Sequence, residues 1–337
     1  SLLNQAKQNP GQKVSVIVQS SAGVDAAEKA TRGMGALRRR LAISNAVAME
    51  IPAARLAQLA KVPGLTITPD APVKTDAYSM SYVLWPYESG NAALWLDDAA
   101  LAASMPTIAV VDSGIQKSRP DFGNRVVAEV NLSTLDNNSA GDGRGHGTFV
   151  AGIAAGNVYG LAGAAPQAKL VSIDVMDDRG MARTSDVIAA SEWILANKDA
   201  YNIRVANFSL HSATPSNFTH DPLDRAVEKL WFSGVVVVAA AGNYGTPDGP
   251  SGVGYAPGND PFVITVGAVD LNGTARTWDD QPAPFSAYGY THDGFWKPEV
   301  SAAGRYMIGP VPTGSTLAAD KAENMVSPAG YIQLSGT

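Results

Sequence analysis

The sequence predicts an α/β protein whose larger part is a parallel doubly wound sheet, preceded by a small α+β module. The first observation behind this prediction is a set of continuous apolar runs, which are typical of strands covered on both faces. The runs occupy residues 107–111, 169–176, 205–210 and 234–241. The second observation is that helical stretches separate the runs, at residues 146–155, 185–198 and 221–231. Strands and helices that alternate in this way form a parallel sheet with helices on both faces, to which residues 262–269 add a further strand.

The third observation is the different pattern of residues 13–73, which predicts a separate ferredoxin-like module. Strands are expected at residues 13–20, 41–51 and 65–68. Helices are expected at residues 24–34 and 52–60, the second with a proline in its first turn. The order of these elements, β-α-β-(β)-α-β, is that of a ferredoxin-like split βαβ unit. We therefore expect two domains, at residues 1–77 and 78–337, with a linker and docking segment within residues 74–104.

Composition and charge exclude several classes of protein. The chain has 337 residues, of which 45% are hydrophobic and 17% charged, and its formal net charge is -6. The triplet Arg38-Arg39-Arg40 is too short to argue for a nucleic-acid partner. No apolar run approaches the length of a membrane span, so we expect none. The absence of cysteine excludes disulfides, zinc–thiolate sites and a cysteine nucleophile.

Three polar residues are expected to meet at one edge of the predicted sheet. Asp112 ends the first apolar run, Asn243 follows the fourth, and His146 begins the first of the helical stretches. Because parallel sheets bind ligands beyond the carboxyl ends of their strands, an acid, an imidazole and an amide converge there. Such a set is a candidate acyl-transfer site that lacks only its nucleophile. Taken alone, the glycine-flanked His146 also fits a phosphate-binding loop or an ordinary helix start.

Three blocks around these residues resemble the signature blocks of the subtilisin-like serine proteases. They read AVVDSGI at residues 109–115, GHGTFVAG at 145–152 and AAAGN at 239–243. The resemblance extends from about residue 100 to the end of the sequence, and it implies catalysis by an Asp-His-Ser triad. It further implies that Asp112 orients His146, that His146 takes the proton of a serine hydroxyl, and that Asn243 donates to the oxyanion.

The resemblance also implies how a polypeptide substrate binds. Backbone edges would let the substrate add as an extra strand, and these edges belong to Gly180, Met181, Ala182, Ser209 and Leu210. A primary specificity pocket would be lined by Ala240, Ala241, Gly242 and Gly254. Since these four residues are small, we expect an open, apolar pocket that accepts large hydrophobic side chains. His211 departs from the family, which often has glycine at this position.

Subtilisin-like proteases are commonly made with a ferredoxin-like propeptide, which residues 13–73 resemble. The resemblance implies a secreted, unprocessed proenzyme whose own propeptide lays its tail in the cleft. Maturation would cut the chain between Lys74 and Ser81. The chemistry requires no cofactor, and no residue is assigned as a metal ligand. A structural calcium ion is compatible with the family, because Asp121 keeps an acidic position that helps to bind calcium in other members.

The family's serine block reads Gly-Thr-Ser-Met-Ala-x-Pro, and the sequence stops at Gly336-Thr337, one residue before the expected nucleophile. We expect that serine to begin a following segment, or a separate chain released by autoprocessing. A chemically altered serine or a truncated protein would also give a sequence that stops at Thr337. The alternative function is therefore a catalytically inactive binding or inhibitory protein that keeps the fold. A nucleotide-binding domain is disfavoured, because the glycines at 141–147 follow no strand and no lysine occupies a P-loop position.

Overall fold

The computed structural model describes residues 9–70, 83–95, 104–274, 276–326 and 329–337. It divides the chain into two compact units, Ser1–Tyr78 and Ser79–Thr337, each of which has its own core. The predicted maturation segment lies outside the described residues. Within the described ranges, no helix is long and apolar enough to cross a lipid bilayer.

The first unit is a four-stranded antiparallel sheet with two helices. Its elements are β1 (Lys13–Ser20), α2 (Val24–Thr31), β2 (Ala36–Leu41), β3 (Ala46–Pro52), α3 (Leu56–Leu59) and β4 (Leu65–Pro69). The strand order is β2-β3-β1-β4, and each neighbouring pair is antiparallel, as in a ferredoxin-like unit. Val16 and Val18 of β1 pack with Leu56 and Leu59 of α3 in the core of this unit.

The strand predicted at residues 41–51 is confirmed over residues 46–51, but a hairpin turn takes the place of its first residues. Strand β2 ends at Leu41, and β3 begins only at Ala46. Asn45 makes the turn in the left-handed conformation, with a φ of 51°. Strand β2, which contains the arginine triplet, could not be predicted from hydrophobic alternation, because it is exposed along almost its whole length. Arg38 pairs with Glu50 and Arg40 with Glu28, so two of the three arginines form ion pairs on a solvated strand.

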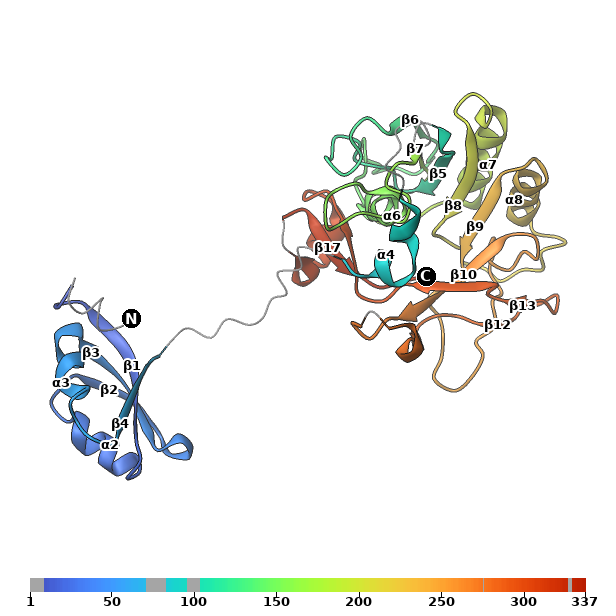
Figure 1. Cartoon of the computed structure of the whole chain (residues 1–337). Helices are drawn as coiled ribbons and strands as arrows, with labels where there is room; N and C mark the ends of the chain where they lie inside the picture. The colour runs from blue at the N-terminus through green and yellow to red at the C-terminus, as the bar shows by residue number, and fades with distance from the viewer. Residues whose placement is uncertain (1–8, 71–82, 96–103, 275, 327–328) are drawn as a thin grey trace. The chain divides into compact units, whose positions relative to one another are not determined.

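The second unit is built on an eight-stranded sheet (Figure 1). The strands that the sequence predicted are β5 (Thr107–Asp112), β7 (Lys169–Asp174), β8 (Ile203–Phe208), β9 (Val236–Ala240) and β10 (Ile264–Asp270). They are parallel to one another, in the order β10-β9-β8-β5-β7, which confirms the predicted parallel sheet. The sequence did not predict β6 (Val126–Asn131), β11 (Gln281–Pro282) or β14 (Val300–Ala303). Of these, β6 and β14 pair in parallel at the two sides of the sheet, whereas the two-residue β11 is antiparallel.

Helices cover both faces of this sheet. Successive side chains of a strand point to opposite faces, so the packing partners of β5 identify which helix lies on which face. Ala109 and Val111 of β5 pack in the cluster that contains α7 (Thr184–Asn197) and α8 (Pro222–Phe232). Val110, which lies between them, packs with Ala151 and Ala155 of α6 (His146–Ala155). The predicted doubly wound architecture is therefore confirmed, with α6 on one face and α7 and α8 on the other.

Smaller elements pack around α6. A three-stranded sheet consists of β15 (Met307–Pro310), β17 (Tyr331–Leu334) and β16 (Met325–Val326), and α9 (Thr316–Asp320) lies between β15 and β16 in the chain. Helix α4 (Trp85–Glu88) belongs to the connection predicted within residues 74–104, and its Trp85 packs in the same cluster as Phe149 of α6. A separate hairpin, drawn beside β10 in Figure 1, consists of β12 (Gly289–Tyr290) and β13 (Trp296–Lys297) and is exposed at Tyr290 and Trp296.

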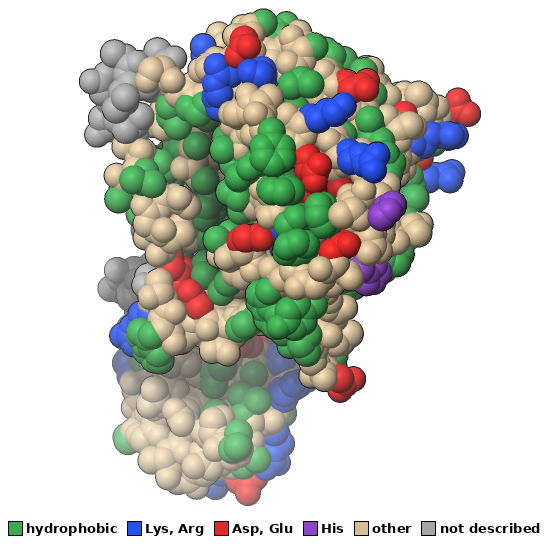
Figure 2. All heavy atoms as spheres, turned by 90° about the vertical axis from the view of Figure 1, so that its right-hand side faces the viewer, with side chains coloured by type: hydrophobic (Ala, Val, Ile, Leu, Met, Phe, Trp, Pro, Cys, Tyr) green, Lys and Arg blue, Asp and Glu red, His purple; other side chains and the backbone are tan. Residues whose placement is uncertain are grey.

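On the face shown in Figure 2, positive and negative side chains are interspersed with hydrophobic patches. Several large apolar side chains are exposed in the second unit, among them Phe232 of α8 and Trp296 of β13.

Two acidic side chains are fully buried beneath the start of α8. Asp224 lies in the first turn of α8, and Asp260 lies in the loop before β10. Burial raises the pKa of Asp224 to about 8, and the charges of Asp221, Asp260 and Glu228 contribute to this rise. Burial likewise raises the pKa of Asp260 to about 7. Both carboxyl groups therefore hold protons in the folded state at pH values where the unfolded chain has lost them.

We expect this pair to make the protein less stable as the pH rises. A raised carboxyl pKa contributes stability that is fully present below the unfolded pKa near 4 and is lost as the pH rises through 7 to 8. The free energy of unfolding should fall by up to about 1.4 kcal/mol per pH unit for each proton. The change Asp224→Asn should flatten this dependence in urea unfolding between pH 5 and pH 8. The change Asp199→Asn, at an exposed carboxylate, is the control and should leave the slope as it is; equal slopes for all three proteins would contradict the assignment.

Candidate active site

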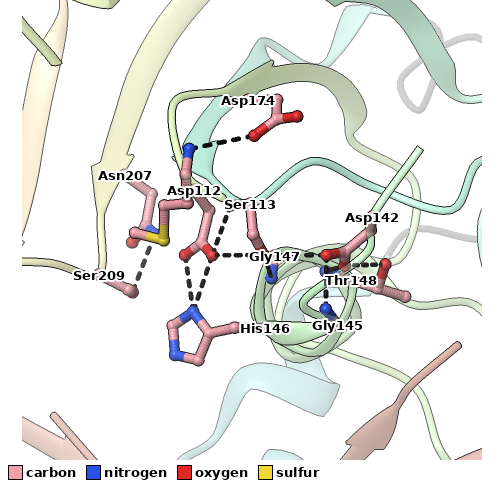
Figure 3. A network of polar contacts seen from close by, with 11 residues as sticks. Asp112, Ser113, Asp142, Gly145, His146, Gly147, Thr148, Asp174, Asn207 and Ser209 are labelled. Atoms are coloured by element: carbon pink, nitrogen blue, oxygen red, sulfur yellow. Dashed lines mark hydrogen bonds and ion pairs between the residues drawn. The ribbon is translucent and has the colours of Figure 1, made fainter. Parts of the chain in front are cut away.

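Asp112 and His146 form a hydrogen-bonded pair at the carboxyl end of β5 (Figure 3). Nδ1 of His146 lies 2.8 Å from Oδ1 and 2.9 Å from Oδ2 of Asp112. The Asp112 side chain is completely buried, and its Oδ1 also accepts a hydrogen bond of 2.8 Å from the backbone N–H of Ser113. From β5 the sheet continues through β7 and β6 on one side and through β8, β9 and β10 on the other. The carboxyl end of β5 therefore lies where the strand order reverses, which is where such sheets bind ligands.

Glycines bring the start of α6 close to β5. A Cβ atom at Gly147 would lie 2.1 Å from the carbonyl oxygen of Gly114, so no larger residue fits there. Gly145 caps the helix in the left-handed conformation, with a φ of 94°. His146 is thereby held as the first residue of α6. Its Nδ1 faces Asp112, and its Nε2 lies on the other side of the ring (Figure 3).

The pKa of His146 reflects opposing effects. Burial of the ring lowers this pKa, whereas the charge of Asp112, the hydrogen bond to Asp112 and the charge of Asp142 raise it. The raising effects prevail, and the pKa of His146 lies above its ordinary value. A carboxylate at Nδ1 stabilises the imidazolium and leaves Nε2 of the neutral ring as the proton acceptor.

Asp142, which the sequence analysis did not single out, holds the start of α6. Its carboxylate accepts hydrogen bonds from the N–H of Gly145 (2.6 Å), from the N–H and hydroxyl of Thr148 (2.8 and 2.5 Å) and from the Ser113 hydroxyl (2.9 Å). The same hydroxyl accepts the N–H of Gly147 at 3.0 Å, which ties the end of β5 to the helix. Burial raises the pKa of Asp142 to about 6, although these hydrogen bonds counteract the rise. The sequence does offer a signal for this role, because an aspartate shortly before a helix often accepts hydrogen bonds from the first N–H groups of that helix.

Asn243 is held by the last residue of the sequence. Its Oδ1 accepts hydrogen bonds from the backbone N–H (2.9 Å) and the hydroxyl (3.1 Å) of Thr337. The Thr337 hydroxyl in turn accepts the N–H of Gly242 at 3.0 Å. These two hydrogen bonds orient the amide group, whose nitrogen carries the N–H donors. Asn243 follows β9, which reaches the same edge of the sheet as β5, with β8 between them.

The residues predicted to bind substrate also follow the carboxyl ends of strands. Beyond β7, Ala182 pairs with Met176 in an antiparallel bridge; Gly180 makes the turn, and Met181 is 60% exposed. Ser209 and Leu210 follow β8 directly, and Ala240, Ala241 and Gly242 form the end of β9 and its continuation. Gly254 lies in a later loop, where a Cβ atom built on it would lie 3.4 Å from Nε2 of His292.

The acidic position associated with calcium is occupied by protein groups. Arg119 Nε lies 2.9 Å from Oδ2 of the buried Asp121, and the Tyr331 hydroxyl donates to its Oδ1. Both oxygens of Asp121 therefore have partners from the chain itself, and this carboxylate does not fit a calcium ligand. Among the residues that the structure describes, no three His, Asp or Glu side chains converge on a common metal position.

Comparison with known proteins agrees with this geometry. A model of the subtilase family, Peptidase_S8, matches residues 104–337. The serine protease AprX of Bacillus subtilis (strain 168) is 37% identical over 212 residues, which are 60% of this chain and 47% of that protein. Subtilisin NAT of Bacillus subtilis subsp. natto is 36% identical over 223 residues, or 66% of this chain and 52% of that protein. The chain thus spans about half the length of these curated relatives.

Two solved structures share the fold. A cold adapted subtilisin-like serine proteinase is 27% identical, with a TM-score of 0.50, and the match covers 68% of each chain. The S41 psychrophilic protease is 28% identical, with a TM-score of 0.54, over 68% of this chain and 71% of the other. The family model covers well over half of the sequence and includes the site of Asp112, His146 and Asn243. The chain belongs to the subtilase family.

Proposed function

We propose that the protein is a serine endopeptidase whose catalytic base is His146. The observation that carries the proposal is the contact of 2.8 Å between Nδ1 of His146 and the buried carboxylate of Asp112. A buried acid fixes the ring orientation and supports the positive charge that forms during proton transfer. Membership of the subtilase family supports the same chemistry.

In this mechanism the nucleophile is a serine that directly follows Thr337, on a following segment or on a separate chain. Nε2 of His146 takes the hydroxyl proton as the serine oxygen attacks the scissile carbonyl carbon. The amide group of Asn243 donates to the resulting oxyanion. His146 then gives the proton to the leaving amine, and water releases the acyl group by the same route. The contacts of Thr337 with Asn243 and Gly242 support this assignment, since they hold Thr337 itself beside the proposed oxyanion donor.

A sulfonyl fluoride that labels active-site serines tests the assignment in the full-length protein. We expect peptide hydrolysis, loss of activity on labelling, and a label on the residue after Thr337. The change Asn243→Ala should lower kcat by about 100- to 1,000-fold, the range for loss of an oxyanion donor, while the serine remains present. Absence of both hydrolysis and labelling would instead support an inactive binding or inhibitory protein. Intact-mass measurement distinguishes a following segment from a separate chain.

We also propose that the first unit is an inhibitory propeptide and that the protein is secreted as a proenzyme that processes itself. The ferredoxin-like strand order of this unit and its place before the protease unit support the proposal. Limited proteolysis near Ala77 should raise the activity toward a small peptide substrate. Unchanged activity after complete cleavage would argue against an inhibitory role.

A further inference from the structure

Each of three segments predicted to line the substrate site is followed within two positions by an aromatic residue. His211 follows Leu210, Tyr244 follows Asn243, and Tyr255 follows Gly254. The ring centroids of Tyr244 and Tyr255 are 4.9 Å apart, and that of His211 lies 5.2 Å from Tyr255 and 5.8 Å from Tyr244. We call these three side chains the aromatic cluster. It lies among the segments where an open pocket was expected.

The Tyr244 ring covers the backbone of Gly242. A Cβ atom built on Gly242 would lie 2.1 Å from Cε1 of Tyr244 and 2.8 Å from its Cδ1. Gly242 has a φ of 103°, so the chain turns back here and brings the side chain of Tyr244 over the residue two places before it. The side of Gly242 where a Cβ would project is therefore filled by the ring. This geometry contradicts the expectation of a pocket that is open at Gly242.

The other two rings restrict Tyr244 in this position. Tyr244 meets Tyr255 at an interplanar angle of 71° and His211 at 78°, the edge-to-face arrangement that aromatic rings favour. His211 is itself fixed, because its Nδ1 lies 2.8 Å from the carbonyl oxygen of Ser212. The hydroxyl oxygen of Tyr244 is buried, so the ring points into the protein. Rotation of Tyr244 out of the pocket would break both ring contacts.

We infer that the aromatic cluster closes the primary specificity pocket, so that the enzyme accepts small side chains and rejects large apolar ones next to the scissile bond. This inference rests on the proposed function. The substrate class is polypeptide with glycine, alanine or serine on the acyl side of the cleaved bond. Tyr244 determines the specificity, because its ring occupies the space beside Gly242 that a large substrate side chain would require.

The test compares two peptides that differ only in alanine or phenylalanine at this position, using the full-length protein. The unchanged enzyme should cleave the alanine peptide with a kcat/KM at least about tenfold higher. The change Tyr244→Ala should raise the phenylalanine-to-alanine ratio of kcat/KM by about 100-fold. His211→Gly removes a ring that holds Tyr244 in place, so it should also raise this ratio. This second variant keeps the test decisive if Tyr244→Ala does not fold.

Two control variants separate the ring from other effects. Tyr244→Phe keeps the ring and should retain the preference for alanine. Tyr290→Ala removes an exposed tyrosine whose ring contact is with Trp296, and it should leave the ratio unchanged. A native enzyme that prefers phenylalanine, or a ratio that neither Tyr244→Ala nor His211→Gly alters, would overturn the inference while leaving the peptidase intact. A protein that neither cleaves peptide nor takes the serine label would overturn the proposed function as well.

Discussion

Replacement of His146 by alanine should lower kcat by about a million-fold, the largest effect expected of a change at any residue that the structure describes. Loss of the corresponding histidine in a subtilisin has an effect of this size, because no other group takes the serine proton. His146 makes the only imidazole contact with Asp112 in the described part of the chain, so no second base is in place. Peptide hydrolysis under saturating substrate gives kcat directly.

His220 provides a matched control for this change. It is an exposed histidine, with its Nδ1 2.7 Å from the Thr219 hydroxyl oxygen, and it has no part in the proposed mechanism. His220→Ala should retain activity within about twofold of the original protein, as is usual for surface changes. An equal loss in both variants, or substantial activity left in His146→Ala, would show that another residue is the base.

Replacement of Asp112 by asparagine should lower kcat by about 10,000-fold. The amide nitrogen of asparagine would face Nδ1 of His146 and donate to it, so the ring would carry its proton on Nε2. That tautomer cannot accept the serine proton, although the geometry of the pair is preserved. The exposed Asp199→Asn change is again the control, and kcat is measured for both variants across a range of pH.

The pH profile distinguishes an orienting role for Asp112 from a merely structural one. The charge of Asp112 and its hydrogen bond raise the pKa of His146, so their removal should lower that pKa. Because the base must be neutral, the acid side of the kcat/KM profile should move to lower pH in Asp112→Asn. A profile that keeps its position while activity falls would indicate a folding defect.

Residues whose role follows from a position along the chain could be predicted from the sequence. Asp112 and Asn243 end apolar runs, and parallel strands place such ends at one edge of a sheet. His146 starts a helix of small and apolar residues, whose packing on β5 follows from that pattern. The strongly apolar strands were predicted for the same reason, since burial on both faces leaves a continuous signature.

Features that depend on contacts between distant segments could not be predicted. β14 has only four residues, Val-Ser-Ala-Ala, and its partner β10 is more than thirty positions earlier in the sequence. Asp142 also accepts a hydrogen bond from the hydroxyl of Ser113, which directly follows β5, and this contact has no sequence signature. The aromatic cluster could not be predicted from the small residues themselves, because the ring that lies over Gly242 belongs to Tyr244, two positions later.

The contact between Arg119 and Asp121 has a consequence for how this region responds to its surroundings. A bound ion stabilises a folded protein in proportion to the logarithm of its free concentration, and dilution or a chelator removes that contribution. Arg119 is part of the chain, and its guanidinium also lies 5.1 Å from the Tyr331 ring centroid. Its positive charge is therefore covalently attached to the protein and cannot be removed by dilution or by a chelator. Because all the partners belong to one chain, the link between Asp121 and the strand of Tyr331 does not depend on the concentration of a dissolved ion.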